Sequence, residues 1–321
     1  MIQFFAVNHQ HLVLINEEDI FANPDQARWI NVESPSQEDI NELMTLYQIP
    51  KYFFTSVLDD HEPSRVANLS SNNDEASMLL LSYPKHQTSP LGYLNYATYP
   101  INFIVIHHII ITISDHPAPF IQRFVMRQEV SSQIIPDQKW LLTQMLWYIA
   151  HDYVTSLNDI SHQMEILEKQ LTSATQNEQI YQIMALQKTL IEFESALTQN
   201  RPVLKALRSA NFLVSDHTSK LNNAAIIENE QALSMCHIQS QILDQYSNMV
   251  SAVVSNNLNA VMKILTSITL ILTIPTIIGG LYGMNVALPG AHLASAFSLI
   301  LFVTIIISAV TLVLLKRHNY M

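Results

Sequence analysis

The sequence has very little glycine, and what it has is gathered in one place. Of the five glycines in 321 residues, four stand between positions 279 and 290, and positions 93–278 contain none. Glycine permits backbone conformations that other residues avoid. Such a tight cluster predicts one local need for a turn or for the close approach of two backbones.

Cysteine and basic residues are also scarce. The single cysteine, Cys236, excludes an intramolecular disulfide and a zinc site of the CxxC kind. The first 130 residues carry fifteen acidic and six basic side chains, and the net charge of the chain is −11. This excess argues against nucleic acid as a partner and suits the attraction of cations, although ordinary solubilising charge explains it equally well. We expect no signal peptide, because the first residues lack its basic and apolar regions.

Charge is missing altogether from residues 264–315, where His292 is the only titratable side chain of the usual polar kind. The stretch is much longer than the roughly 20 apolar residues that cross a bilayer once. It therefore predicts two spans, 264–282 and 293–315, with the glycine cluster between them; a buried helical hairpin in a soluble protein is the alternative. Basic residues flank the spans at Lys263, Lys316 and Arg317 but are absent from the loop. By the positive-inside rule, both termini lie in the cytoplasm.

The first 135 residues predict a mixed α/β domain. Short apolar or β-branched runs are typical of strands, and five are present: MIQFFAV, HLVLIN, RWINV, ASMLLLSYP and INFIVIHHIIITIS. Ser34, Pro35 and the acidic residues after them indicate the start of a helix with Pro35 in its first turn. His107 and His108 are candidate metal ligands, but a turn inside an apolar β-hairpin is the simpler interpretation.

Proline is almost absent between Pro136 and Pro275, where Pro202 is the only one. Apolar residues recur there at helical spacing, as in the set Leu157, Ile160, Met164, Leu167 and Leu171. Residues 136–263 therefore predict long helices that pack together or against sister subunits. Because nothing after Pro202 obviously breaks the helix, one rod is expected to run from the cytoplasm into the first span.

One face of the first span is polar. Alternating steps of three and four residues connect the members of this face, which we call the seam: Asn259, Met262, Thr266, Thr269, Thr273, Thr276 and Gly280. Leu265 borders it. A helix-packing face of small residues is the alternative, but four threonines in register on an Ile- and Leu-rich span favour the lining of a pore. Since one hairpin has no interior, this pore needs several copies around an axis.

The chemistry of the seam bears on the ion that would pass. The seam offers hydroxyls and carbonyls but no carboxylate, so it is unsuited to stripping a strongly hydrated cation of its water. It suits an ion that keeps much of its hydration shell, as Mg²⁺ does.

The residues that follow the first span complete a known pattern. Tyr282, Gly283, Met284 and Asn285 stand between the two spans at the end of the run NNLNAVMKILTSITLILTIPTIIGGLYGMN. This arrangement resembles the CorA family of divalent-cation transporters. Weaker similarity upstream extends the resemblance over essentially the whole chain, in RWINVESP, SVLDDHEPSRV, LQKTLIEFESALTQNRPVL and ENEQAL.

The resemblance implies a fold and a role for each part of the membrane segment. The fold is an α+β cytoplasmic domain, long helices and a C-terminal two-helix transmembrane hairpin, assembled as a homo-oligomeric, typically pentameric, funnel. The four residues 282–285 form the selectivity filter, in which a ring of Asn285 side chains binds the hydration shell of the ion. Asn259, Met262 and Leu265 lie near the cytoplasmic constriction, with Met262 and Leu265 as an apolar gate.

The sequence departs from the family pattern in two places. The loop VALPGAH is uncharged, whereas many members carry an acidic residue there, so cations should be concentrated less strongly at the mouth. Ala224 and Ala225 stand near the position of a regulatory carboxylate in some members, which leaves the regulatory Mg²⁺ site unassigned. The other acidic cytoplasmic residues considered share only their charge with that site: Asp59, Asp60, Asp74, Glu75 and Glu228.

The sequence therefore predicts a channel-like Mg²⁺ transporter of the plasma or inner membrane, and not an enzyme. Co²⁺ and Ni²⁺ are expected secondary ions, and the expected partners are further copies of the chain, the lipid bilayer and divalent metal ions. A Zn²⁺ transporter of the ZntB kind, which could be coupled to protons, is one alternative. A carboxylate or histidine within a span would support proton coupling, and the predicted spans contain neither. A membrane-anchored helical scaffold or sensor that transports nothing is the other.

The expected domain organisation follows from these boundaries. We expect a cytoplasmic α/β domain at 1–135, a helical stalk at 136–263 and a pore-lining span at 264–282. An extracellular loop at 283–292, a second span at 293–315 and a basic cytoplasmic tail at 316–321 complete the chain.

Overall fold

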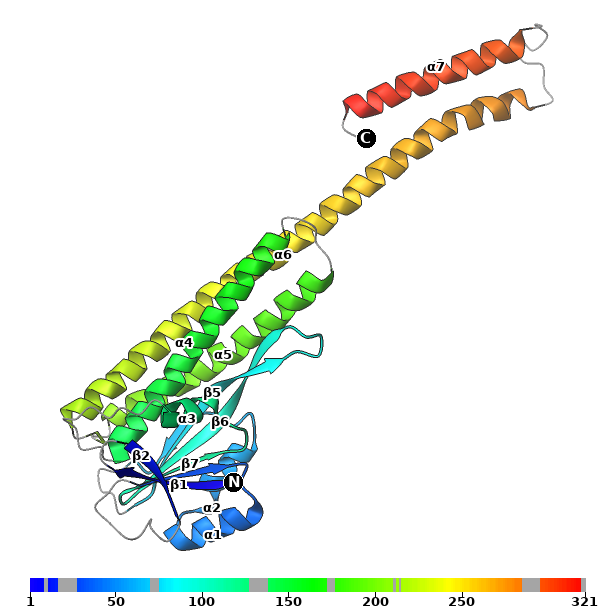
Figure 1. The fold of residues 1–321 in the computed structure, drawn as a ribbon. Coiled ribbons are helices and arrows are strands. Elements are labelled where there is room, and N and C mark those ends of the chain that lie inside the picture. The colour runs from blue at the N-terminus through cyan, green and yellow to red at the C-terminus, as the bar shows by residue number, and fades with distance from the viewer. Residues whose placement is uncertain are drawn as a thin grey trace. The chain divides into compact units, whose positions relative to one another are not determined.

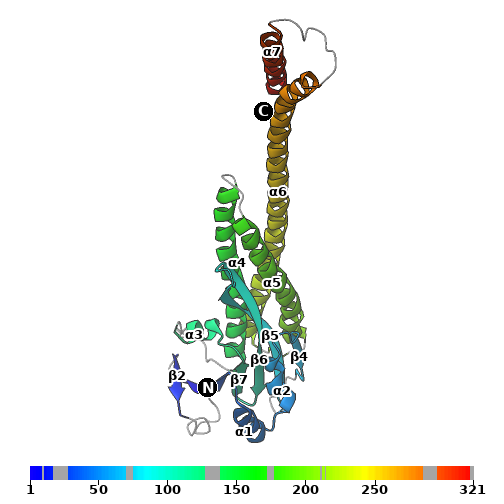
Figure 2. The same cartoon turned by 90° about the vertical axis from the view of Figure 1, so that its right-hand side faces the viewer.

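The computed structural model describes residues 1–8, 11–16, 28–69, 75–126, 138–171, 177–209, 212–213, 215–284 and 295–318. The chain divides into two compact units, Met1–Ser247 and Asn248–Met321. Helix α6 (Asp216–Tyr282) begins in the first unit and ends in the second. Figures 1 and 2 show the elements of each unit.

A seven-stranded sheet forms the centre of the first unit, in the order β2-β1-β3-β7-β6-β5-β4. All five runs predicted as strands lie in it. The strands are β1 (Ile2–Asn8), β2 (His11–Ile15), β3 (Arg28–Glu33), β4 (Arg65–Ala67), β5 (Ser77–Thr88), β6 (Leu94–Ile106) and β7 (Ile109–Ser114). Only β3 and β7 pair in parallel; the other neighbours in the sheet are antiparallel.

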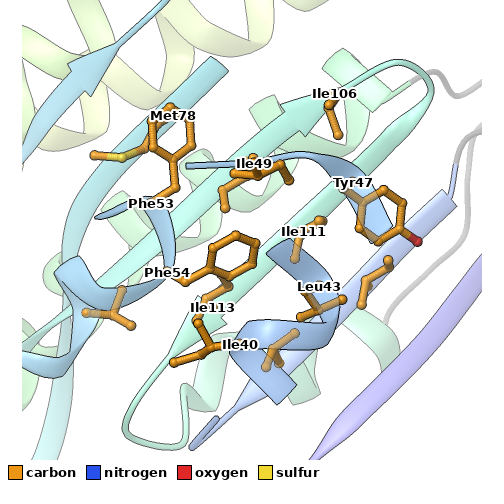
Figure 3. Close-up of a cluster of buried hydrophobic side chains, with 14 of the residues drawn as sticks. Ile40, Leu43, Tyr47, Ile49, Phe53, Phe54, Met78, Ile106, Ile111 and Ile113 are labelled. Atoms are coloured by element: carbon orange, nitrogen blue, oxygen red, sulfur yellow. The ribbon is translucent and has the colours of Figure 1, made fainter. Parts of the chain in front are cut away.

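Two short helices and a 3-10 turn cover one face of the sheet: α1 (Gln37–Tyr47), α2 (Lys51–Thr55) and η2 (Ser56–Leu58). Figure 3 shows the apolar cluster beneath them. Phe53 and Phe54 of α2 pack there against Met78, Ile111 and other side chains from alternate positions of the strands. Apolar burial of this kind, at roughly 25 cal/mol per Å², fixes α1 and α2 on the sheet.

Helix α1 begins after Pro35, at Gln37, and not with Pro35 in its first turn as predicted. Ser36 is the N-cap, and its Oγ accepts a hydrogen bond from the Asp39 backbone N–H at 3.1 Å. The Asp39 carboxylate accepts one from the Ser36 N–H at 2.9 Å, and these bonds lower the pKa of Asp39. Pro35 therefore precedes the cap instead of occupying the first turn, because this capping box satisfies the exposed N–H groups from Ser36 itself.

The opposite face is covered by the short helix α3 (Pro119–Met126) and by two long helices, α4 (Gln138–Leu171) and α5 (Asn177–Ser209). With both faces of the sheet covered, the first five residues of β5 are buried without alternation. The apolar stripe predicted on residues 157–171 is confirmed, since all five of its members are buried. The two-histidine turn is confirmed as well, because His107 and His108 connect β6 to β7 and His107 has a φ of 51°.

The prediction that a single helix runs from Pro202 into the first span is wrong, because this helix begins only at Asp216. Helix α5 continues through Pro202 to Ser209, and α6 begins at Asp216. A proline inside a helix costs one backbone hydrogen bond and a steric clash. Burial of Val203, Leu204 and Leu207 on the following turns offsets that cost.

Helix α6 is fastened to α5 by hydrogen bonds that repeat every seven residues. Asn222 Nδ2 donates to the Leu204 carbonyl at 3.0 Å, and Asn229 Nδ2 donates to the Leu197 carbonyl at 3.2 Å. The Cys236 thiol donates to the Leu190 carbonyl at 3.1 Å. We call Asn222, Asn229 and Cys236 the ladder. Because its donors and acceptors are each seven residues apart on antiparallel helices, the ladder fixes the register of α6 on α5.

Asn229→Ala is expected to lower the free energy of unfolding by about 1–3 kcal/mol, because the buried Leu197 carbonyl loses its side-chain donor. Chemical denaturation of the full-length chain in detergent measures the change. Asn223→Ala is the matched control, since Asn223 is adjacent to the ladder but only half-buried. Equal losses in the two variants would contradict a specific role of the ladder.

The buried carboxyl of Asp152 in α4 is expected to make the stability of the protein depend on pH. Its carboxylate is 6% exposed and pairs with Arg123, yet burial raises the pKa from 3.8 to about 6. Because the folded-state pKa is raised, the contribution of the Asp152 carboxyl to stability is fully present below pH 4 and is lost as pH rises through 6. We expect this group to lower the free energy of unfolding by about 2 kcal/mol from pH 4 to pH 7. Asp152→Asn should remove that part of the pH dependence in denaturation of the full-length chain; identical pH profiles would contradict it.

Candidate ion pathway along helix α6

Two helices of the second unit are long and apolar enough to cross a membrane. The most apolar windows of α6 and of Phe297–Arg317 in α7 (Ala296–Arg317) have mean hydropathies of 2.0 and 2.8. Only 6% of each window is buried. Core helices of soluble proteins are mostly buried, so the alternative of a buried hairpin does not fit.

Each of the two helices has one stripe that is less exposed than its other sides, which we take as the side that faces the other helix. The least exposed positions of α6 beyond residue 260 are Ser267, Ile271, Ile274 and Ile278. Those of α7 are Ile300, Thr304, Ser308, Thr311 and Leu315. Both sets follow helical steps of three and four residues. Small hydroxylated residues begin the α6 set and fill the centre of the α7 set, and such residues permit close approach in lipid.

The seam lies on another side of α6, and all seven of its residues are exposed. Successive residues of an α-helix are turned by about 100°. The centre of the seam is therefore turned by roughly 150° from the stripe that packs on α7. Packing of the hairpin leaves the threonines uncovered, so they are not explained by contact with α7.

The threonine hydroxyls of the seam present oxygen acceptors. Thr269 Oγ1 donates to the Leu265 carbonyl at 2.8 Å, Thr273 Oγ1 to the Thr269 carbonyl at 2.7 Å, and Thr276 Oγ1 to the Leu272 carbonyl at 2.9 Å. The protons of these three hydroxyls are thus bonded within the helix, while the lone pairs of their oxygens remain available as acceptors on its surface. Water bound to a cation turns its hydrogens outward and needs such acceptors.

The largest apolar side chains of the seam stand at the end that comes first in the sequence. Met262 and the bordering Leu265 are 58% and 57% exposed, one turn before the first threonines. Asn259 is exposed on the preceding turn. Copies of α6 around an axis would bring these residues together as an apolar collar below a polar lining, the arrangement expected of a gate.

At the other end, α6 finishes at Tyr282 and a turn follows at Gly283. The Gly283 N–H donates to the Gly279 carbonyl at 2.9 Å, and a Cβ on Gly283 would lie only 3.2 Å from that oxygen. Glycine fits this tight helix end without strain. The predicted filter residue Asn285 lies outside the described residues, as do Pro289, Gly290 and His292.

Gly279 and Gly280 have a different explanation. A Cβ added to either residue would meet nothing within 4 Å in its own chain. Among the described residues, therefore, no contact within the chain requires glycine at these two positions. Close approach of another copy of α6 would require it.

The carboxylates considered as substitutes for a regulatory site are dispersed over the first unit. Asp60 Oδ1 lies 3.0 Å from His116 Nε2, and Glu228 Oε1 lies 2.7 Å from His151 Nδ1, whose ring stacks on another aromatic side chain. Asp59 caps its own turn, and Asp74 lies outside the described residues. Within the described part of one chain, no three His, Cys, Asp or Glu side chains are placed to share a metal ion.

Ala224 and Ala225, the positions near the regulatory carboxylate of some family members, differ in their surroundings. Ala225 is fully buried between two members of the ladder, whereas Ala224 is partly exposed. A carboxylate at position 225 would be desolvated against α5. Only position 224 is open to a neighbouring molecule.

Comparison with known proteins assigns the family. The family model described as CorA-like Mg2+ transporter protein matches residues 24–317. The cobalt/magnesium transport protein CorA of Methanocaldococcus jannaschii is 24% identical over 297 residues, which are 91% of this chain and 90% of that protein.

Solved structures agree with this assignment at the level of the fold. The complete CorA magnesium transporter from Methanocaldococcus jannaschii superposes with a TM-score of 0.84 at 21% identity, covering 100% of this chain and 99% of the other. The ZntB cytoplasmic domain from Vibrio parahaemolyticus gives a TM-score of 0.57 at 14% identity, covering 79% of this chain and 98% of the other. The α+β domain, long helices and apolar C-terminal helix pair are the expected fold, and the chain belongs to the CorA family of transporters.

Proposed function

We propose that the chain is a channel-like transporter that passes partly hydrated Mg²⁺ through a central pore. Several copies, a pentamer by the family resemblance, would surround the pore with their α6 helices. Residues 282–285 would form the selectivity filter at the outer mouth, and Met262 and Leu265 the gate at the cytoplasmic end. Relatives carry the names of cobalt and magnesium transport proteins, so Co²⁺ is the second ion that we propose.

The observation that supports this proposal most strongly is the placement of the seam. It is uncharged, rich in oxygen acceptors, fully exposed in one chain and turned away from α7. Four hydroxylated positions facing lipid would gain nothing, whereas the same positions around an axis would contact the hydration water of an ion.

The proposal includes an orientation and a set of domains. Lys263 at the start of the first span and Lys316 and Arg317 at the end of α7 favour a cytoplasmic location for both ends. Residues 1–135 and 136–263 would then form the cytoplasmic α/β domain and stalk. Residues 264–282 and 293–315 would span the plasma or inner membrane, with 283–292 outside and 316–321 as a basic cytoplasmic tail.

Ion flux in liposomes that contain the purified protein tests the proposal. We expect Mg²⁺ entry that is competed by Co²⁺, and an oligomer in mild detergent by size-exclusion chromatography with light scattering. A monomer that still transports would refute the shared pore. A protein that moves no divalent cation would be the helical scaffold of the alternative interpretation.

The same measurement separates Mg²⁺ from Zn²⁺ transport. The described part of the two spanning helices, residues 264–282 and 296–315, contains no acidic residue and no histidine. An intramembrane ionisable group is the usual carrier of a proton-coupled step. We therefore expect Mg²⁺ flux that is independent of a proton gradient; Zn²⁺ flux that follows the gradient would favour the ZntB kind of transporter.

A further inference from the structure

Two hollows on the first unit carry opposite charges. One, of about 510 Å³, lies between α5 and α6 and is lined by Lys205, Arg208, Asn223, Ile226 and Ile227. We call it the basic hollow. The other, of about 330 Å³, lies where α5 meets β5, β6 and the residues that follow η2. We call it the acidic hollow, because its described lining includes the carboxylates of Asp60, Glu62 and Glu192 but no Lys or Arg.

The cations at the basic hollow outnumber the carboxylates that balance them. Arg201 and Lys205 both pair with the same carboxylate, that of Glu230. Among the described residues, no carboxylate lies within ion-pair distance of Arg208. These three of the sixteen Lys and Arg residues stand within eight positions of α5. In a chain with a net charge of −11, such a local excess indicates a negatively charged partner.

The acidic hollow has the opposite imbalance. Glu62 and Glu192 each pair with one cation, from Arg65 and Lys188 respectively. The Asp60 side chain is 46% exposed, and only a histidine ring lies within ion-pair distance of it among the described residues. Asp60 is therefore the least balanced carboxylate of its hollow, as Arg208 is the least balanced cation of the other.

The two hollows lie on opposite flanks of α5. This helix lines the acidic hollow with Glu192, Ser195, Ala196 and Gln199, and the basic hollow with Lys205 and Arg208. Because successive residues are turned by about 100°, the two sets are about 160° apart around the helix. One chain therefore cannot join its own hollows, since α5 stands between them. A contact that repeats around a ring joins two different patches of neighbouring copies, and these two patches have complementary charges.

The residues at the basic hollow do not fit a regulatory Mg²⁺. Mg²⁺ takes oxygen ligands, chiefly carboxylates and water. Ala224, near the regulatory carboxylate position of some family members, offers no such ligand, and the adjacent Asn223 shares its hollow with two cations. Lys205 and Arg208 would repel a divalent cation and attract a carboxylate.

We infer that neighbouring copies join through these hollows by direct ion pairs, with Asp60 of one copy paired to Arg208 of the next and no divalent cation at the contact. This inference rests on the proposed function, which requires several copies around a pore. The contact also covers Ile227, which is 66% exposed at the basic hollow in the single chain. It should hold when Mg²⁺ is removed and weaken as salt rises, because salt screens partly exposed charges.

Cross-linking between the hollows tests the inference in the full-length protein in mild detergent. Ser195→Cys places a thiol in the acidic hollow and Asn223→Cys one in the basic hollow, and neither change removes a charge. A short bismaleimide should link the double variant into multimers on a denaturing gel, while each single variant stays monomeric. The native thiol of Cys236 gives a quiet background, since it is buried and its surroundings raise its pKa to about 12.

The yield of cross-linked multimers distinguishes ion pairs from a metal bridge. It should be unchanged when EDTA replaces Mg²⁺, and it should fall by about threefold or more in about 1 M NaCl, where the Debye length is about 3 Å. A yield that falls in EDTA would indicate a metal-bridged contact and overturn the inference. A double variant that forms no multimers would overturn it as well.

Exchange of the charges tests the pair itself. On the double-cysteine background, Arg208→Glu should lower the yield of multimers by about fivefold. Asp60→Arg added to it should restore most of the yield, because the same pair is then present with its charges exchanged. Lys51→Glu is the matched control, since Lys51 is exposed on α2 and lines neither hollow. A loss no greater than that of the control, or one that Asp60→Arg does not restore, would overturn the pairing.

Mg²⁺ flux into liposomes keeps this inference apart from the proposed function. A protein that transports Mg²⁺ but forms no multimers between the hollows would overturn the contact alone. Multimers formed by a protein that moves no divalent cation would support the contact and overturn the proposed function.

Discussion

Asn285→Ala is expected to lower Mg²⁺ flux by at least about tenfold, the equivalent of about 1.4 kcal/mol in the barrier to passage. The amide of Asn285 supplies an oxygen acceptor without a fixed charge, which suits the outward-turned hydrogens of water around Mg²⁺. Alanine keeps the loop neutral and short but deletes this acceptor from every copy. Flux of the parent and the variant is compared in liposomes with equal amounts of oligomer.

Asn285→Asp keeps an oxygen acceptor at this position and adds a negative charge to it. One carboxylate per copy should bind cations more tightly, yet tighter binding also slows release, so flux need not rise. Size-exclusion profiles of both variants should match the parent, because the change is confined to the loop after α6. An Asn285→Ala protein that conducts Mg²⁺ like the parent would contradict the filter assigned to residues 282–285.

Much of the fold can be predicted from the sequence, because its strongest signals are local. The charge-free interval 264–315 and the apolar runs of β5, β6 and β7 each indicate their own structure through composition alone. Membership of the CorA family confirms what these signals predict at the coarse level, a membrane transport protein and not an enzyme.

The errors of the sequence analysis occur where packing overrides local preference. The rod was expected to follow Pro202, but α5 continues through this proline to Ser209, and burial of the side chains on the next turns holds it together. Likewise, Ser36 and not Pro35 determines where α1 begins, because it forms the reciprocal bonds with Asp39. Propensity is a weak prior wherever tertiary contacts decide.

An uncharged face of helix α6 upstream of Asn259 could have been found from the sequence but was not. The signal is that no charged residue occupies the positions between 227 and 255 that lie in the same heptad register as the seam. It becomes visible only when the alternating steps of the seam are continued toward the N-terminus. What no pattern reveals is that this phase is uncovered. That depends on Asn222, Asn229 and Cys236 binding carbonyls of α5, which turns the opposite face of α6 outward.

Met262→Asp is expected to raise Mg²⁺ leak several-fold by wetting the apolar collar. In the single chain Met262 is 58% exposed on the seam, next to the polar Asn259 and Thr266. An apolar ring of this size closes a pore by excluding water, and a ring of carboxylates holds water and cations instead. Leak is measured as the initial rate of dye-detected Mg²⁺ entry into liposomes that contain equal amounts of oligomer.

Val261→Asp is the matched control for this gate. Val261 is 60% exposed on the same turn of α6, but its side chain is turned by about 100° from that of Met262. The same charge is thus added at the same depth without entering the seam. A rise confined to Met262→Asp would support the collar, whereas equal rises in both variants would indicate a loosened assembly. If the Met262→Asp oligomer is intact and its leak is that of the parent, Met262 is not the gate and closure depends on another part of the seam.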